Sequence, residues 1–235
     1  MAELFDGIAQ RQFNKILCGA ISNAHLREYF NACFQEAIDS YGAYQCWTCI
    51  NCMRQGNATQ GWGAPPSRCT RCRSPLVYEI ATFQSRSSIV GSAFEAAFFH
   101  LIQTHYRIPL TLTPGNTRTH DFEVTGEVAI EAKGSPSKVA NPNSTFTELD
   151  RPGLERSDTK KKAFDNARTY RQRNPTGLFF IVSNAVPSDL VGYRNRDVTA
   201  VFDVNKTDRI ESMILEIRGK VDLPYLQRQR GWTPT

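Results

Sequence analysis

The sequence predicts an α/β or α+β protein, with a mixed central sheet flanked by helices and a small zinc-binding element near the N-terminus. Three observations lead to this prediction. Apolar residues recur at helical spacing near both ends of the chain, short apolar or alternating runs typical of strands lie between them, and five of the seven cysteines lie between positions 46 and 72. No internal repeat interrupts this order.

The chain divides into three segments. Residues 1–40 form a helical segment in this prediction, because Leu26, Phe30 and Phe34 recur at four-residue intervals. Residues 41–75 are rich in Gly, Pro, Cys and Trp and poor in aliphatic residues, so they need a source of stability other than an apolar core, such as a bound metal. Residues 76–235 then form the main core.

The elements of the core follow from periodicity and capping signals. In chain order we expect a strand over 76–83, a helix over 87–107 capped by Ser87 or Ser88, two strands within 119–134, a loop over 135–153, a basic helix capped by Ser157, strands within 177–186 and 198–204, and a final helix around 210–217. The run at 177–186 is almost continuously apolar, which suits a strand covered on both faces.

The stretch 119–134, THDFEVTGEVAIEAKG, is expected to form a charged β-hairpin in which Asp121, Glu131 and Lys133 share the face opposite the apolar residues. A three-residue connection places Asp121 across from Glu131, whereas a two-residue turn would set Asp121 against Ile130 and mismatch the apolar faces. Two carboxylates so close repel each other unless a cation lies between them. Lys133 is one candidate, and Mg²⁺, which prefers oxygen ligands and retains several waters, is the other.

Asp121, nine intervening residues and then Glu131-Ala132-Lys133 on an adjacent strand resemble the active site of the PD-(D/E)xK nuclease superfamily. The helix before the hairpin carries GSAFE, ending at Glu95, and resembles the glutamate-bearing first helix of that superfamily. The basic helix and apolar strand downstream also resemble it, so the likeness covers roughly residues 87–220.

The resemblance implies a role for each of these residues. Asp121, Glu131 and the carbonyl of Ala132 would hold a catalytic Mg²⁺, Lys133 would orient or deprotonate the attacking water, and Glu95 would support a second metal ion. One departure is visible: a histidine, His120, stands where the family pattern has a proline. That departure leaves the metal ligands unchanged.

The implied function is Mg²⁺-dependent, site-specific cleavage of double-stranded DNA by a restriction-endonuclease-like core, as in type II restriction enzymes, which commonly act as homodimers. A structure-specific or repair nuclease with the same core is an alternative. A zinc-ribbon nucleic-acid-binding protein without catalysis is the alternative outside enzymes.

The basic stretch 156–173 contains seven basic residues against two acidic ones, which favours a polyanionic partner. We expect Lys160, Lys161 and Arg168 to contact DNA. The alternative is a solvated helix face whose lysines only maintain solubility.

The spacing C-x₂-C-x₂-C-x₁₆-C-x₂-C predicts a zinc site of four thiolates. Five cysteines are available for four positions, and Cys49 belongs to either possible first knuckle. The favoured set is Cys46, Cys49, Cys69 and Cys72, with Cys52 as the alternative to Cys46. Arg71 and Arg73, beside the second knuckle, are expected to contact DNA, unless the element is a purely structural zinc clip.

The sequence shows no membrane or export signal. No window approaches the roughly 18 apolar residues of a membrane span, and the N-terminus lacks the basic and apolar regions of a signal peptide. We therefore expect a cytoplasmic protein without a disulfide framework, in which Cys18 and Cys33 are ordinary buried residues.

Overall fold

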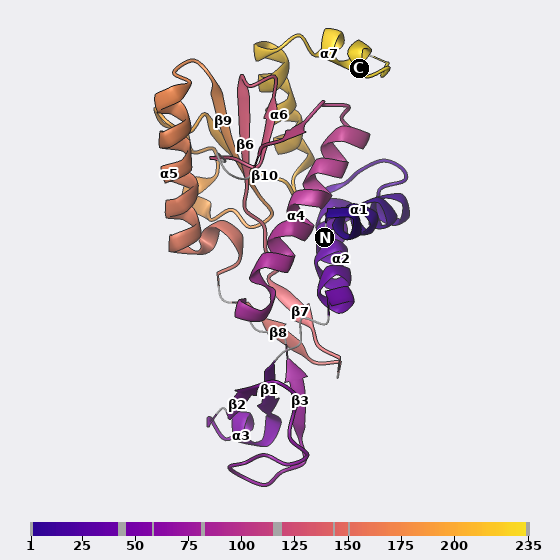
Figure 1. Ribbon diagram of the computed structural model, residues 1–235, viewed down its shortest axis with the longest axis vertical. Coiled ribbons are helices and arrows are strands. Elements are labelled where there is room, and N and C mark those ends of the chain that lie inside the picture. The colour runs from indigo at the N-terminus through magenta and orange to yellow at the C-terminus, as the bar shows by residue number, and fades with distance from the viewer. Residues whose placement is uncertain are drawn as a thin grey trace.

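The computed structural model describes residues 2–41, 46–57, 59–80, 83–114, 119–142, 144–149 and 151–233. Its centre is a five-stranded sheet of order β10-β9-β6-β5-β4 (Figure 1). The strands are β4 (Thr111–Leu112), β5 (Phe122–Val124), β6 (Val128–Ala132), β9 (Leu178–Ser183) and β10 (Ala200–Asp203). Neighbours are antiparallel from β4 to β6 and parallel from β6 to β10, so the predicted mixed sheet and α+β class are confirmed.

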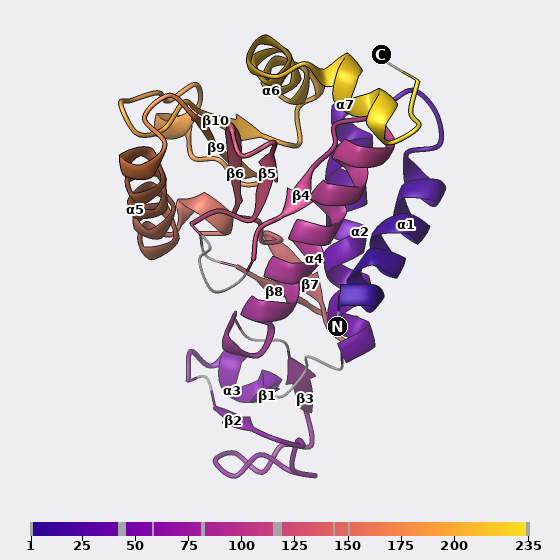
Figure 2. The same cartoon turned by 45° about the horizontal axis from the view of Figure 1, so that its top comes forward.

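Helices cover both faces of this sheet. They are α4 (Phe83–Thr104), α5 (Ser157–Arg173) and α6 (Thr207–Lys220), with α1 (Ala2–Ile16) and α2 (Asn23–Tyr41) packed behind α4. Figure 2 shows α5 on one side of the sheet and α4, with α1 and α2 beyond it, on the other. The predicted N-terminal helical segment is confirmed, and it consists of two helices. Among the described helices, none is both long and apolar enough to span a membrane.

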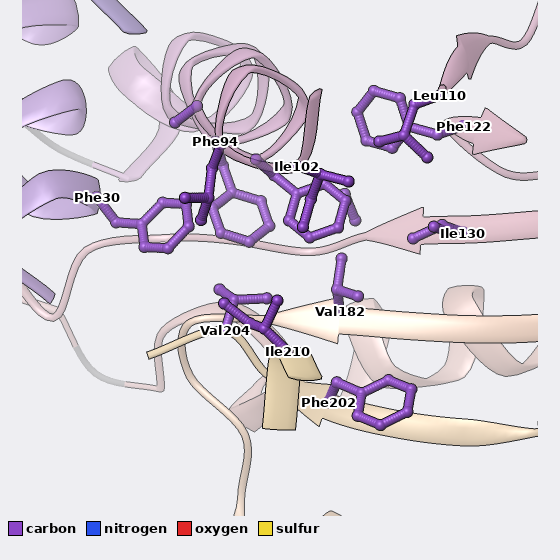
Figure 3. Packing of buried hydrophobic residues seen from close by; sticks show 14 of the residues in the cluster. Phe30, Phe94, Ile102, Leu110, Phe122, Ile130, Val182, Phe202, Val204 and Ile210 are labelled. Atoms are coloured by element: carbon purple, nitrogen blue, oxygen red, sulfur yellow. The ribbon is translucent and has the colours of Figure 1, made fainter. Parts of the chain in front are cut away.

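Strand β9 shows why both faces need helices. Phe180 and Val182 enter the larger core with α4 and α6, while Phe179 and Ile181 pack against α5. Figure 3 shows the larger core, in which aromatic side chains of α2 and α4 meet the sheet residues. The prediction from the continuous apolar run, a strand covered on both faces, is confirmed.

The cysteine-rich element is a small three-stranded sheet of order β2-β1-β3 with one short helix. Its parts are β1 (Cys46–Cys49), α3 (Ile50–Arg54), β2 (Gln60–Trp62) and β3 (Val77–Ile80). The strand expected over 76–83 exists in shortened form, but it pairs with β1 rather than joining the main core. The small sheet therefore extends past the predicted boundary at residue 75, to Ile80.

Three local expectations also needed correction. Helix α4 begins at Phe83, so Ser87 and Ser88 lie inside the helix and cap nothing. Ser157 is the first residue of α5, and Arg156 occupies the N-cap without a side-chain hydrogen bond. Cys33 is buried as predicted, but Cys18 is exposed, because it follows the end of α1.

The expected loop over 135–153 contains a short hairpin, and the C-terminus contains an additional helix. These elements are β7 (Lys138–Ala140), β8 (Phe146–Glu148), the 3₁₀ turns η1 (Gly153–Glu155) and η2 (Ser188–Leu190), and α7 (Leu223–Gln229). The carboxylate of Asp222 caps α7 by accepting the N–H of Tyr225, a signal present in the sequence.

Candidate catalytic site and cysteine cluster

The charged hairpin has the predicted register. Phe122 pairs with Ile130 and Val124 with Val128, so apolar residues meet across the two strands. The three-residue connection is possible because Gly126 adopts a φ of 74°. The N–H of Asp121 donates to the carbonyl of Ile130 at 3.0 Å, which fixes Asp121 at the start of the hairpin.

The two acidic side chains meet at one lysine. The Nζ of Lys133 lies 2.5 Å from Oε1 of Glu131 and 3.5 Å from Oδ2 of Asp121. The same ammonium donates to the carbonyl oxygen of Ala132 at 2.9 Å. The two carboxylate oxygens are therefore at most about 6 Å apart, and all three oxygens predicted to hold a metal ion contact one cation.

Both carboxylates are buried and held in place. Asp121 is 4% exposed and Glu131 2%. The N–H of Ala132 donates to Oδ2 of Asp121 at 2.7 Å, and Nδ2 of Asn166 in α5 donates to Oε1 of Glu131 at 2.9 Å. Sequence reasoning did not select Asn166. The sequence did contain a signal for Asn166: it is a polar residue on the face of α5 that Ala163 and Ala167 direct toward the sheet.

Burial and charge shift the acid–base properties of the site. Burial, together with the carboxylate of Asp121, raises the pKa of Glu131 to about 7, although Lys133 and Asn166 oppose that rise. Burial lowers the pKa of Lys133, but the carboxylates of Glu131, Asp121 and Glu95 outweigh it and raise that pKa. Lys133 is therefore protonated at neutral pH, and Glu131 titrates near neutrality.

A cavity of about 170 Å³ is lined by Lys133, together with Glu95 of α4 and with Arg156 and Thr159 at the start of α5. The buried carboxylates of Asp121 and Glu131 are not part of its lining. Glu95 therefore shares a cavity with Lys133, while its support of a second metal ion stays a prediction. Among the described residues, however, its carboxylate does not join those of Asp121 and Glu131 in a cluster of three metal ligands.

A glycine lets α4 approach the site closely. A β-carbon on Gly134 would lie 2.1 Å from the ring of Phe94, so only glycine fits directly after Lys133. The neighbouring His120 is buried, and its ring packs edge-on against that of Tyr170 in α5 at 5.3 Å.

The basic helix is less available to a polyanion than its sequence implied. Lys160 pairs with Asp189 at 2.6 Å, and Arg168 lies 3.5 Å from Asp165. Arg171 donates to the carbonyl of Gly177 and serves the fold. Lys161 is exposed, and no ion pair is recorded for it within the described part of the chain.

Four cysteines converge in the small element: Cys49, Cys52, Cys69 and Cys72. Their sulfurs all lie within 4.8 Å of one another, and the Cys49–Cys72 and Cys52–Cys69 pairs are 3.6 and 3.7 Å apart. Four sulfurs at 2.3 Å from a tetrahedral zinc ion are about 3.8 Å apart. The cluster can therefore bind a metal ion such as zinc.

The prediction of Cys46 as a ligand was wrong, and Cys52, its alternative, is the fourth member of the cluster. Cys46 and Cys49 both belong to β1, where residues three apart point to opposite faces of the sheet. Cys49 instead caps α3, and the helical turn brings Cys52 back toward it, with the N–H of Cys52 3.5 Å from Sγ of Cys49.

Hydrogen bonds at the second knuckle favour thiolates. The amide of Asn51 and the N–H of Ser74 lower the pKa of Cys72 to about 6. The N–H groups of Cys72 and Arg71 lower the pKa of Cys69, and the latter donates to Sγ of Cys69 at 3.4 Å. Since zinc binds the thiolate form, these donors favour metal binding at the second knuckle. At the first knuckle the hydroxyl of Thr59 lowers the pKa of Cys52, but burial and the neighbouring cysteines outweigh it and raise that pKa to about 11.

The function of the chain must be inferred from this geometry. No family model, no curated protein and no solved structure matches the chain.

Proposed function

We propose that the protein is a Mg²⁺-dependent endonuclease that cleaves double-stranded DNA at specific sites, with a core resembling the PD-(D/E)xK nucleases. One observation carries the proposal. Oxygens of Asp121, Glu131 and Ala132, the three ligands that the resemblance implies, all contact the same ammonium.

These oxygens fit a magnesium ion. Two carboxylates and a carbonyl are the hard oxygen ligands that Mg²⁺ prefers, and the cavity lined by Ala132 and Lys133 has room for the waters that it retains. The ammonium of Lys133 now occupies the position between the carboxylates. Binding of Mg²⁺ there therefore requires the Lys133 side chain to move aside.

Residues of the chain have separable tasks in this proposal. Asn166 holds Glu131 by its Oε1 atom, and the N–H of Ala132 holds Asp121, so the carboxylates keep their positions when Lys133 moves. Lys133 keeps its positive charge at the cavity and offsets negative charge that develops on the phosphate. Bound Mg²⁺ would stabilise the same charge and acidify water.

The cavity supports a phosphate-containing substrate. Arg156 is part of its lining, at the start of α5, where backbone N–H groups and the helix dipole also favour anions. We assign Lys160, Lys161 and Arg168 along the same helix as contacts to DNA phosphates. The four-cysteine cluster holds a structural Zn²⁺ in this proposal, and two copies of the chain act together to cut both strands.

The ion pairs of Lys133 also suit a nucleic-acid-binding protein without catalysis. In that case the ammonium simply neutralises two buried carboxylates. A repair or structure-specific nuclease would share the whole site and differ only in substrate. Cleavage assays separate the three readings.

The decisive assay incubates supercoiled plasmid with the zinc-loaded protein in Mg²⁺ or in Ca²⁺. We expect linear DNA with Mg²⁺ alone, and sequenced ends that share one motif. Glu131→Gln should abolish cutting, whereas Glu127→Gln, an exposed acid of the same hairpin that pairs with Lys220, should not. No cutting by the unaltered protein, or full cutting by Glu131→Gln, would refute the proposal.

A further inference from the structure

The cysteine element carries an excess of positive charge. From residue 46 to 80 it contains four arginines, Arg54, Arg68, Arg71 and Arg73, against one acidic residue, Glu79. A Zn²⁺ on four thiolates carries a net charge of −2, so the element keeps a small net positive charge with its metal bound. Its surface thus complements a polyanion.

All four arginines are exposed, and hydrogen bonds hold the backbone around three of them. Arg71 and Arg73 lie on the second knuckle, where the N–H of Arg71 donates to Sγ of Cys69 and the N–H of Arg73 donates to the carbonyl of Cys69. Arg68 donates to the carbonyl of Arg73 at 3.3 Å. A metal site that only stiffens the fold does not require this presentation of guanidinium groups.

The two tryptophans of the element, Trp47 and Trp62, differ in burial. Trp47 is buried and packs so closely on Gly61 that a β-carbon there would lie 2.5 Å from its ring. Trp62, the next residue of β2, is 64% exposed. Trp47 therefore serves the fold, and Trp62 offers an apolar surface that the element itself does not use.

The element also lies near the candidate catalytic site. Strand β3 ends at Ile80 and α4 begins at Phe83, so Glu95 is twelve residues, about 18 Å, along the helix. The link from Ile80 to Phe83 adds at most roughly 10 Å. Figures 1 and 2 show the element beyond the N-terminal end of α4. The end of β3 therefore lies within roughly 28 Å of Glu95.

We propose that the cysteine element is the sequence-reading part of the protein, which contacts base edges of a DNA duplex. This inference rests on the proposed nuclease function. Arg71 and Arg73 are the principal readers, because an arginine fork matches the two acceptors of guanine in the major groove. The core then supplies cleavage, and the element supplies specificity.

Selection from a random duplex library tests the inference without requiring cleavage. The zinc-loaded protein is incubated with the library in Ca²⁺, and bound duplexes are sequenced. We expect one enriched motif for the unaltered protein, and at least a tenfold loss of its preference over a scrambled duplex for Arg71→Ala/Arg73→Ala. The control Lys15→Ala/Arg209→Ala removes the same charge from α1 and α6 and should retain the motif.

Zinc content distinguishes misfolding of the element from the loss of its contacts to DNA. Neither arginine is a zinc ligand, so a folded double variant should keep one zinc per chain. A double variant that keeps the motif, or that weakens binding equally to the motif and the scrambled duplex, would overturn base reading by the element. Motif selection without cutting by the unaltered protein would refute the nuclease and leave only base reading by the element.

Discussion

Replacing Lys133 by methionine tests whether its ammonium stands in for a metal ion. Methionine keeps much of the side-chain volume but leaves the buried Glu131 and Asp121 without their cation. Removing one partner of a buried ion pair typically costs about 3 to 5 kcal/mol of unfolding free energy. At about 2 °C per kcal/mol for a chain of this size, the metal-free variant should melt roughly 6 to 10 °C lower at pH 8.

Mg²⁺ should reverse much of this loss. In the unaltered protein Mg²⁺ has to displace an ammonium, whereas in Lys133→Met the two carboxylates lack any cation. At a Mg²⁺ concentration 100 times the dissociation constant, binding contributes about 2.7 kcal/mol. Thermal melting at pH 8 with and without Mg²⁺ should therefore show a larger increase in Tm for the variant, which nevertheless cleaves no DNA.

Glu131→Gln in the same background is the matched control. It removes one of the two uncompensated charges and a proposed ligand, so it should raise the Tm of metal-free Lys133→Met and remove its response to Mg²⁺. Equal Mg²⁺ responses of the unaltered protein and Lys133→Met, or a response that survives Glu131→Gln, would show that the carboxylates do not form the metal site.

Three further results are expected. The Mg²⁺-dependent increase in Tm should grow as pH rises through about 7, because Mg²⁺ binds the charged form of Glu131 and the raised pKa of Glu131 keeps this side chain neutral at lower pH. Glu131→Gln should show no such pH dependence. An increase in Tm that is the same at every pH in the unaltered protein would contradict this prediction. Zinc analysis in reducing buffer should find about one zinc per chain in Cys46→Ser and none in Cys52→Ser. The reverse result would show that Cys46, and not Cys52, is the fourth ligand. Gly134→Ala should lower the unfolding free energy by about 1 to 3 kcal/mol in denaturant melts, because the added β-carbon would overlap the ring of Phe94. Adding Phe94→Leu to this variant should restore part of the lost unfolding free energy. If it restores none, the strain does not come from the contact with Phe94.

The register and the faces of the hairpin could be predicted from the sequence because they depend only on residues within the hairpin itself. Alternation assigns each side chain to a face, and only one register pairs Phe122 with Ile130 and Val124 with Val128. That register places Asp121 beside Glu131. Charge repulsion predicted a cation between them, either Lys133 or Mg²⁺, and the structure places Lys133 there.

The cysteine ligands depended on local structure that spacing does not encode. C-x₂-C reads the same from Cys46 as from Cys49, but a strand separates residues three apart, whereas a turn into a helix brings them together. Strand β3 was misplaced for a related reason. Its partner β1 lies some thirty residues earlier, and no local pattern reveals a pairing over that distance.

The environment of Glu131 could not be predicted from the hairpin. Its burial comes from α5, which supplies Asn166 across the sheet face. That contact depends on how α5 packs, and the packing is set by Ala163, Ala167 and Tyr170 together rather than by any residue near the acid. The raised pKa of Glu131 is a consequence of that packing.

Binding of Mn²⁺, followed by electron paramagnetic resonance in zinc-loaded protein, tests the central claim most directly. Mn²⁺ takes the same oxygen ligands as Mg²⁺ and reports free ion without requiring DNA. We expect Asp121→Asn and Glu131→Gln each to abolish a site that Glu127→Gln retains. Equal Mn²⁺ binding by all three variants and the unaltered protein would contradict a metal site at these carboxylates.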